Sequence, residues 1–239
     1  MTLLFILIVA FAFFAQSIMG FGGGLIAVPL LSLFLPIQDA VTVVILFQVL
    51  IGLLVFKTHR DTSWNVIWRM LPAMVLGVIF GILSLKYIHG DIIRLIFAAY
   101  IIVHLLRIHT SFDPFKSAIE RGGRALASFL GGSLNAMVGG GGPPFALYFK
   151  ELAMSPVTLR ANLTAILFLS NIPRIFGSYA ADFISVDLLL LGATAIPAFL
   201  VAIFLGQKLH DKIPQKTFLT LIDVLLVCTV LSLLIKVAL

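Results

Sequence analysis

Charged side chains are scarce in this chain. Of its 239 residues only 11% are Asp, Glu, Lys or Arg, whereas 61% are hydrophobic, and the mean hydropathy is +1.17. A soluble domain carries about 25% charged residues, so this composition excludes a water-soluble domain of this size. Cysteine is scarce too. The single Cys228 excludes a disulfide within the chain, and we expect it to serve packing.

The sequence also lacks a dense basic block, although its net charge is +6. That absence argues against nucleic-acid binding. The first basic residue is Lys57, so the N-terminus lacks the charged region of a cleaved signal peptide and is expected to remain in the protein. No Gly-x-x-x-x-Gly-Lys-[Ser/Thr] run occurs, which excludes ATP hydrolysis by this chain itself.

What the sequence does contain is a series of long apolar runs. Several approach the roughly 20 residues needed to cross hydrocarbon, and none shows the period-2 alternation of a barrel strand. We therefore expect an all-α polytopic membrane protein. The runs are Asp39–Phe56, Met70–Leu85, Ile92–Leu106, Asn162–Ala181, Leu188–Gly206 and Phe218–Ile235.

Glycine and proline landmarks recur in the two halves of the chain. The pairs, each roughly 120 residues apart, are Gly22–Gly24 with Gly140–Gly142, Pro36 with Pro156, and Pro72 with Pro197. Each half then consists of a glycine-broken helical hairpin followed by three transmembrane helices. Because five segments is an odd number, the second half enters from the opposite face, which is the inverted-topology repeat of many secondary transporters. The expected units are a first repeat at 1–109, a cytoplasmic linker at 110–123 and an inverted second repeat at 124–239.

The basic residues provide a test of this topology. Twelve of them fall in loops on the side opposite the N-terminus, and three fall on the same side as the N-terminus. The positive-inside rule makes the first side cytoplasmic and places both termini on the periplasmic or extracellular side. The twelve are Lys57, Arg60, Arg69, Arg107, Lys116, Arg121, Arg124, Lys150, Arg160, Lys208, Lys212 and Lys216, and the three are Lys86, Arg94 and Lys236.

The glycine runs are expected to lie inside the membrane. The arms Ala125–Val138 and Pro143–Phe149 would be helices of about 21 Å and roughly 10 Å, so neither covers the ~30 Å core. A re-entrant hairpin is the economical solution. The first element has longer arms, Thr2–Met19 and Leu25–Ile37, and could reach deeper or nearly cross. Because the hairpins enter from opposite faces, their glycine tips should approach each other.

Backbone N–H groups at such breaks need a partner, because lipid offers none. Helices starting at Leu25 and Pro143 present free N–H groups and a positive dipole end, and proline suits a first turn. Two such ends together would form an anion site. Its glycines would be Gly22, Gly23, Gly24, Gly140, Gly141 and Gly142. The alternative is that the glycines only permit close helix packing.

At these residues the sequence resembles a known family. Met19–Gly24 with Pro29, and Gly139–Gly142 with Pro143, are similar to the duplicated signature of the sulfite exporter TauE/SafE family. The resemblance covers essentially the whole chain. It implies a bacterial cytoplasmic-membrane transporter of small sulfur-containing anions such as sulfite or sulfonates. Nothing in the spacing itself selects sulfur.

Polar residues near the glycine runs are candidate substrate contacts. Asn135 precedes the second run by four residues, and Ser17, next to Gln16, occupies the matching region of the first. These side chains could donate to a bound oxyanion or cap the broken helices. Gln48, in the first of the three long helices, is a weaker candidate for the same cavity.

The second half contributes further polar candidates. Asn162, Asn171 and Arg174 lie on one predicted helix. Arg174 could pair with an anion through its guanidinium, or it could snorkel to the outer face or join a structural pair. Asp223, in the last apolar run, could carry a coupling proton because burial would favour its neutral form, or it could pair with a basic residue.

Together these features predict a secondary transporter of small anions, by resemblance sulfur oxyanions or organosulfonates. It would work by alternating access around a midplane site formed by the two glycine breaks. The alternatives are a permease or channel for another solute such as a carboxylate, or the membrane subunit of a larger complex. Catalysis is not expected, because His104 and His210, the histidines that could serve Ser133, fall at or near cytoplasmic ends. We expect no metal or cofactor. The expected partners are the lipid bilayer and a small anion, with homo-oligomerisation left open.

Overall fold

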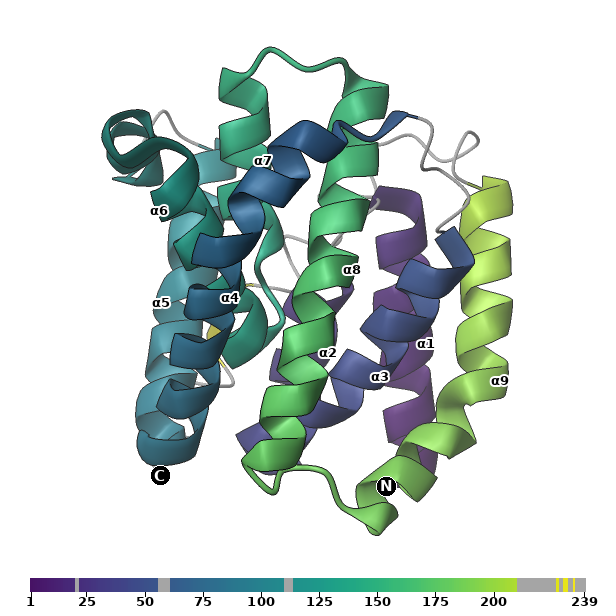
Figure 1. The fold of residues 1–239 in the computed structure, drawn as a ribbon. Helices are drawn as coiled ribbons and strands as arrows, with labels where there is room; N and C mark the ends of the chain where they lie inside the picture. Colours follow the sequence, from purple (N-terminus) through teal and green to yellow (C-terminus); the bar gives the residue numbers. More distant parts are fainter. Residues whose placement is uncertain are drawn as a thin grey trace.

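The computed structural model describes residues 1–19, 22–55, 61–109 and 114–209, together with residues 227, 230, 231 and 234. Within these residues the chain is entirely helical and contains no strand (Figure 1). The all-α expectation is therefore confirmed for this part of the chain. The helices are α1 (Thr2–Met19), α2 (Gly23–Leu31), α3 (Ile37–Val55), α4 (Trp64–Tyr87), α5 (Gly90–His109), α6 (Pro114–Val138), α7 (Gly142–Glu151), α8 (Pro156–Ala180) and α9 (Val186–Leu209).

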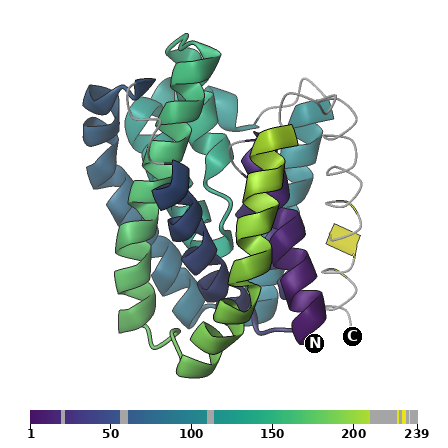
Figure 2. The same cartoon turned by 90° about the vertical axis from the view of Figure 1, so that its right-hand side faces the viewer.

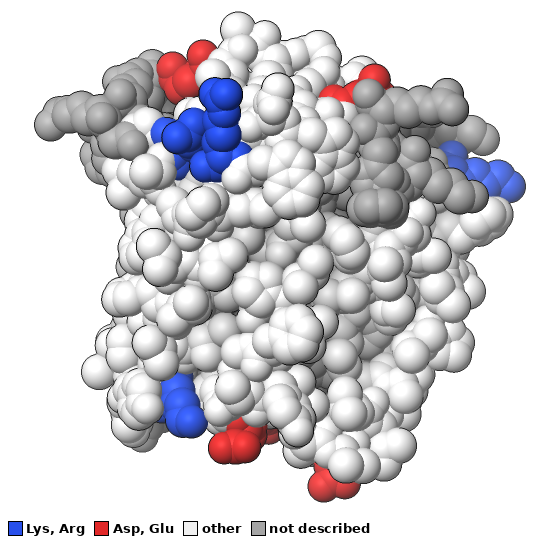
Figure 3. All heavy atoms as spheres, viewed as in Figure 1, with Lys and Arg blue, Asp and Glu red and all other residues white. Residues whose placement is uncertain are grey.

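The outer surface of the bundle is that of a membrane protein. Among the described residues, three spans have the length and apolar composition to cross a membrane: Ile37–Leu54, Trp64–Tyr87 and Val186–Lys208. Large apolar side chains on α4 and α9, such as Phe80 and Phe204, are more than half exposed. On the face shown in Figure 3, the coloured charges gather at the two ends and leave a broad uncharged band between them. In water this exposed apolar band would drive association with other molecules. In a membrane the lipid tails contact it directly.

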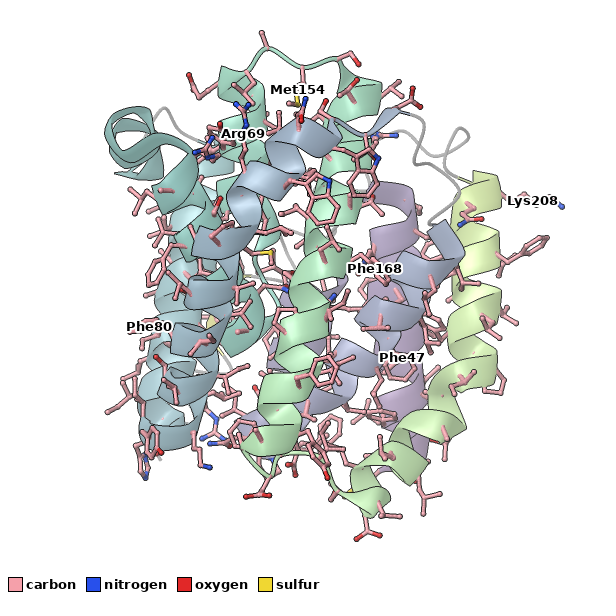
Figure 4. All side chains as sticks on the ribbon, viewed as in Figure 1. Phe47, Arg69, Phe80, Met154, Phe168 and Lys208 are labelled. Atoms are coloured by element: carbon pink, nitrogen blue, oxygen red, sulfur yellow. The ribbon has the colours of Figure 1, made fainter. Side chains whose placement is uncertain are left out.

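The two ends of the bundle differ in charge. Arg69, Met154 and Lys208 lie at one end, and the N-terminus of α1 lies at the other (Figures 1 and 4). Met154 belongs to the turn between α7 and α8, so Lys150 and Arg160 flank the same end. The opposite end includes the turn between α4 and α5, where Lys86 and Arg94 are found, and Arg94 pairs with Asp91.

Two pairs of helices pack closely through glycine. A Cβ atom added to Gly77 would overlap the carbonyl oxygen of Phe129, and one added to Gly132 would overlap that of Met74, so α4 and α6 run parallel in close contact. In the same way a Cβ on Gly206 would overlap the Ser17 hydroxyl, and α1 and α9 lie side by side in both ribbon views (Figures 1 and 2). Each glycine-broken element therefore packs against a long helix from the other half of the chain.

The two helix breaks fall where the glycine runs predict them. The first separates α1 from α2, and Gly22 adopts φ 100°. The second separates α6 from α7, and Gly139 adopts φ 67°. Both values lie in the left-handed region that glycine enters without a Cβ clash. Glycine is therefore required at both turns by conformation as well as by packing.

The arms of the hairpins differ in part from the predicted arms. α6 changes direction at Gly123 (φ 56°, ψ −143°), so its straight part begins at the predicted arm, and residues 114–122 of the predicted linker are also helical. The arm predicted as Leu25–Ile37 is wrong in length. α2 ends at Leu31, followed by a turn in which the N–H of Leu35 donates to the carbonyl of Leu31, and Pro36 precedes α3. The predicted arm overlooked this turn because Ser32–Ile37 is almost as apolar as the helix before it.

Candidate functional site

The two glycine breaks contact each other inside the bundle. Gly24, at the start of α2, lies so close to Gly139 that a Cβ atom on Gly24 would overlap the Gly139 carbonyl oxygen. Gly140 of the second break accepts a hydrogen bond from the Tyr100 hydroxyl on α5. Gly23, Gly24 and the run Gly139–Gly142 are all buried. The breaks thus bring the first turns of α2 and α7 to one buried place.

A cavity of about 180 Å³ lies at this junction. It is large enough for an anion of a few heavy atoms, because a water molecule occupies about 30 Å³ in the liquid. None of the described residues that line it carries a charge. Seven of the predicted site residues line it: Ser17, Gly22, Gln48, Asn135, Gly140, Gly142 and Asn171.

A hydrogen-bonded network of side chains surrounds this cavity. The Asn135 amide nitrogen donates to Ser170 Oγ at 2.7 Å and to Asn171 Oδ1 at 3.1 Å. The Gln48 amide nitrogen donates to the carbonyl of Gly139 at 3.3 Å. Asn135 Oδ1 is buried and accepts no hydrogen bond from the described residues. The network therefore joins α3, α6 and α8 at the second glycine break.

Arg174 is the charged member of the network and is fully buried, with a relative exposure of 0%. Its Nη1 donates to Gln48 Oε1 at 2.6 Å and to Asn171 Oδ1 at 3.3 Å, and its Nη2 donates to the Val41 carbonyl at 3.4 Å. Snorkelling to the outer face, one interpretation of the sequence, is therefore wrong. The guanidinium turns inward because α3, a helix of the other half, supplies acceptors for it.

Some residues around the first break line the cavity, and others only make hydrogen bonds or packing contacts with their neighbours. Gln16 Oε1 accepts from the N–H of Gly23 at 3.1 Å, so this side chain caps α2 across the break. The Ser17 hydroxyl donates to the Phe14 carbonyl of its own helix. Gly23 and Gly24 do not line the cavity. Their closeness to Gln16 and Gly139 shows that they allow the backbone to approach.

Other predicted residues lie elsewhere. Gly141 packs against the backbone of α6 behind the cavity wall. Asn162 lies near the Met154 end, where its Oδ1 accepts from the N–H of Ser63 at 2.7 Å and its Nδ2 contacts Met154 Sδ at 2.9 Å. Asp223 lies outside the described residues, as do the side chain of His104 and the whole of His210.

The sequence predictions missed Thr164, Phe168 and Gln207, which also line the cavity. A signal for Thr164 was available, because seven residues before Asn171 is about two helical turns and places both on one face of α8. The nine residues from Asn162 to Asn171 are about two and a half turns, which places those two on opposite faces. Gln207 follows the glycine that packs on α1, and no sequence pattern marked it.

A cluster of aromatic rings packs in the core outside the cavity lining. Phe13, Phe47 and Phe199, from α1, α3 and α9, are buried, and their ring centroids lie 5.1 to 5.6 Å apart. Figure 4 shows Phe47 closer to the N-terminal end of the bundle than the cavity-lining Phe168. The cavity also reaches the exposed Gln207, next to Lys208 at the basic end. The lining of the cavity therefore extends toward the basic end at Gln207.

Comparisons with known proteins identify the family of this chain. The sequence model described as sulfite exporter TauE/SafE matches residues 5–233. A curated relative, the "Probable sulfite/organosulfonate exporter TauE" of Cupriavidus necator, is 25% identical over 148 residues. That match covers 59% of this chain, and the chain spans 58% of the relative's length. No solved structure matches the chain. The members of the matched family are transporters and not enzymes, and this chain belongs to the sulfite exporter TauE/SafE family.

Proposed function

We propose that this protein is a secondary transporter of small sulfur oxyanions or organosulfonates, with the substrate bound where the two glycine breaks meet. The observation that carries the proposal is the uncharged cavity between the first turns of α2 and α7, whose wall includes several amide and hydroxyl side chains. The name of the Cupriavidus necator relative supplies the substrate class.

The chemistry of the cavity suits an anion. The first N–H groups of a helix have no intrahelical acceptor and carry a partial positive charge. α2 and α7 have nine and ten residues and begin at Gly23 and Gly142, so both place the positive end of the helix dipole near the cavity. Fewer N–H groups are free than in an ordinary first turn, because Pro143 and Pro144 carry none and the Gly23 N–H donates to Gln16. No acidic side chain among the described residues lines the cavity to oppose an anion. Backbone and amide donors can therefore replace part of the hydration shell that the anion loses.

The packing of the helices supports an inverted repeat with re-entrant hairpins. α1 packs parallel to α9, and α6 packs parallel to α4, so each hairpin pairs with the fourth helix of the opposite half. α4 and α9 also have the same length of 24 residues. A two-fold relation between the halves would exchange these two contacts. We propose that transport moves one such pair against the other and exposes the site alternately to the two sides.

The distribution of charge supports an orientation in a bacterial cytoplasmic membrane. Five basic residues with described side chains, Arg69, Arg124, Lys150, Arg160 and Lys208, lie at the Met154 end, and Lys86 and Arg94 lie at the other. By the positive-inside rule the Met154 end is cytoplasmic and the N-terminus is periplasmic. We place the C-terminus on the same side as the N-terminus, because the last apolar run adds one further crossing, and we retain Asp223 as the candidate for proton coupling.

Flux measurements in proteoliposomes test the function. Sulfite, thiosulfate, short sulfonates and short carboxylates would each be offered to the purified protein, with empty vesicles as background. We expect saturable flux of sulfite or a sulfonate, and strongly reduced flux in Asn171→Leu, which removes an amide from the cavity wall. Gly90→Ala is the control, because a Cβ there meets only ordinary contacts at 3.8 Å or more.

The substrate panel separates the alternatives. Flux of carboxylates alone would replace the sulfur-anion assignment, and flux that does not saturate would indicate a channel. An Asn171→Leu protein that transports as the wild type does would remove the cavity from the transport path.

A further inference from the structure

Arg174 lies behind the cavity wall and not in it. Its guanidinium contacts Gln48 and Asn171, and these two carboxamides line the cavity while Arg174 does not. It is completely buried, at 0% exposure. Among the described residues no carboxylate lies within ion-pair distance of it. An anion in the cavity would therefore meet the amides first.

The guanidinium determines which way these amides face. Arginine carries five N–H donors and no acceptor, so a carboxamide beside it must turn its oxygen toward it. Gln48 Oε1 does so at 2.6 Å, and Asn171 Oδ1 does so at 3.3 Å. Asn171 Oδ1 also accepts from Asn135, which gives its amide a second reason for the same orientation.

The amide nitrogens are consequently turned away from Arg174. Gln48 Nε2 has two N–H groups, and the described structure uses one, in a bond of 3.3 Å to the Gly139 carbonyl. Asn171 Nδ2 makes no hydrogen bond to a described residue. Gln48 and Asn171, which could each present either an oxygen or a nitrogen, therefore turn nitrogen away from Arg174. Asn135, the third carboxamide of the cavity wall, does not contact Arg174; its nitrogen donates to Ser170 and Asn171, and its Oδ1 has no donor among the described residues.

We infer that Arg174 is a positioning residue which turns the amide nitrogens of Gln48 and Asn171 toward the cavity, so that these two amides donate to the oxygens of a small oxyanion and no direct ion pair with Arg174 forms. This inference rests on the proposed function and specifies how its substrate is recognised. Neutral amide donors bind an oxyanion less strongly than a guanidinium would, which keeps release fast. The buried charge still strengthens each donor by polarising the amide it contacts.

A double-mutant cycle with sulfite as the probe tests the inference. Arg174→Lys keeps the positive charge but cannot hold both amide oxygens in the same geometry. We expect Arg174→Lys and Gln48→Leu each to raise the sulfite Kd roughly tenfold, and the double variant to be no worse than the single variants. A hundredfold increase of the sulfite Kd in the double variant would mean that the two residues contact sulfite directly and independently. An unchanged sulfite Kd in Arg174→Lys would mean that only the positive charge at this position matters. Either result would overturn the inference.

A second variant covers the case in which Arg174→Lys does not fold. Gln48→Glu keeps an acceptor for Arg174 and so preserves its partner, but it replaces the cavity donor with an acceptor. We expect a folded protein, judged by size-exclusion profile and melting temperature, that binds sulfite at least tenfold more weakly. Unchanged sulfite binding in this variant would also overturn the inference.

A measurement without substrate separates this inference from the proposed function. The side-chain amide resonance of Gln48, assigned by its loss in Gln48→Leu, should shift in Arg174→Lys. The resonance of Gln38 should not, because Gln38 donates to the Leu85 carbonyl at 3.4 Å in another part of the bundle. If the wild type binds none of the anions, the proposed function fails and the resonance still decides the role of Arg174. An unshifted Gln48 resonance removes the positioning role even if transport is observed.

Discussion

The two glycine breaks are built from the same residue type but are closed by different neighbours. At the first break a Cβ on Gly23 would meet the end of the Gln16 side chain, which can rotate away. At the second break a Cβ on Gly141 would overlap the carbonyl oxygen of Gly131 and lie 2.7 Å from the Cβ of Asn135. Gly23 is therefore bounded by an adjustable side chain and Gly141 by backbone, whereas Gly24 of the first break also meets backbone, at the Gly139 carbonyl.

This difference means that two similar glycine runs can respond differently to amino-acid substitution. The first run has three consecutive glycines, whereas the second has four followed by Pro143 and Pro144. The prolines fix φ in the first turn of α7. Gly141 is therefore held more rigidly than Gly23, and substitutions at Gly141 should have the larger effect.

The largest effect is expected from Gly141→Val, because its β-carbon meets main chain that cannot move without displacing α6. Overpacking of this kind costs about 1–3 kcal/mol and occasionally more. We expect a large fall in melting temperature and no sulfite flux. Gly90→Ala is the matched control, and a Gly141→Val protein of normal stability and flux would contradict the rigid second break.

An intermediate effect is expected from alanine at the two left-handed positions, Gly22 and Gly139. A residue with a Cβ pays about 1–2 kcal/mol there. Both variants should fold with lower melting temperatures. Gly139→Asn should be milder than Gly139→Ala, because asparagine tolerates this conformation better. Equal melting temperatures for all three variants and the wild type would show that the positive φ values are not required.

The smallest effect is expected from Gly23→Ala, because Gln16 can swing aside at the loss of one hydrogen bond, about 1 kcal/mol. Adding Gln16→Ala to the Gly23→Ala variant should lower the stability little further, because Gln16 has already moved away from position 23 and lost its hydrogen bond. Thermal unfolding of the two single variants and the double variant measures this coupling. A Gly23→Ala protein as damaged as Gly141→Val would remove the contrast between the breaks.

Much of this fold could be predicted from local sequence. Long apolar runs identify helices because lipid permits little else, and glycine runs identify breaks because glycine alone lacks a Cβ. The prediction that the two tips approach each other agrees with the contact of Gly24 and Gly139. The inverted relation of the halves and the depth of the tips in a membrane remain predictions.

What local sequence could not supply was the partner of each polar residue. Arg174 is buried because Gln48 and Val41 of a helix more than 120 positions away accept its hydrogen bonds. Asn162 is occupied with Ser63, 99 positions away. Polarity within an apolar run shows that a partner must exist, but only the packed helices show which partner it is.

The pairing of α1 with α9 has a consequence for how the protein is made. The contact between Ser17 and Gly206 joins the first helix of the chain to the last described one. At roughly 5–20 residues per second, α1 leaves the ribosome many seconds before its neighbour exists. During that interval the face of α1 that later contacts α9 must be covered by lipid or by the insertion machinery. The first half would therefore insert as an incomplete bundle. The face of α1 that contacts α9 would stay unpacked until the second half is made.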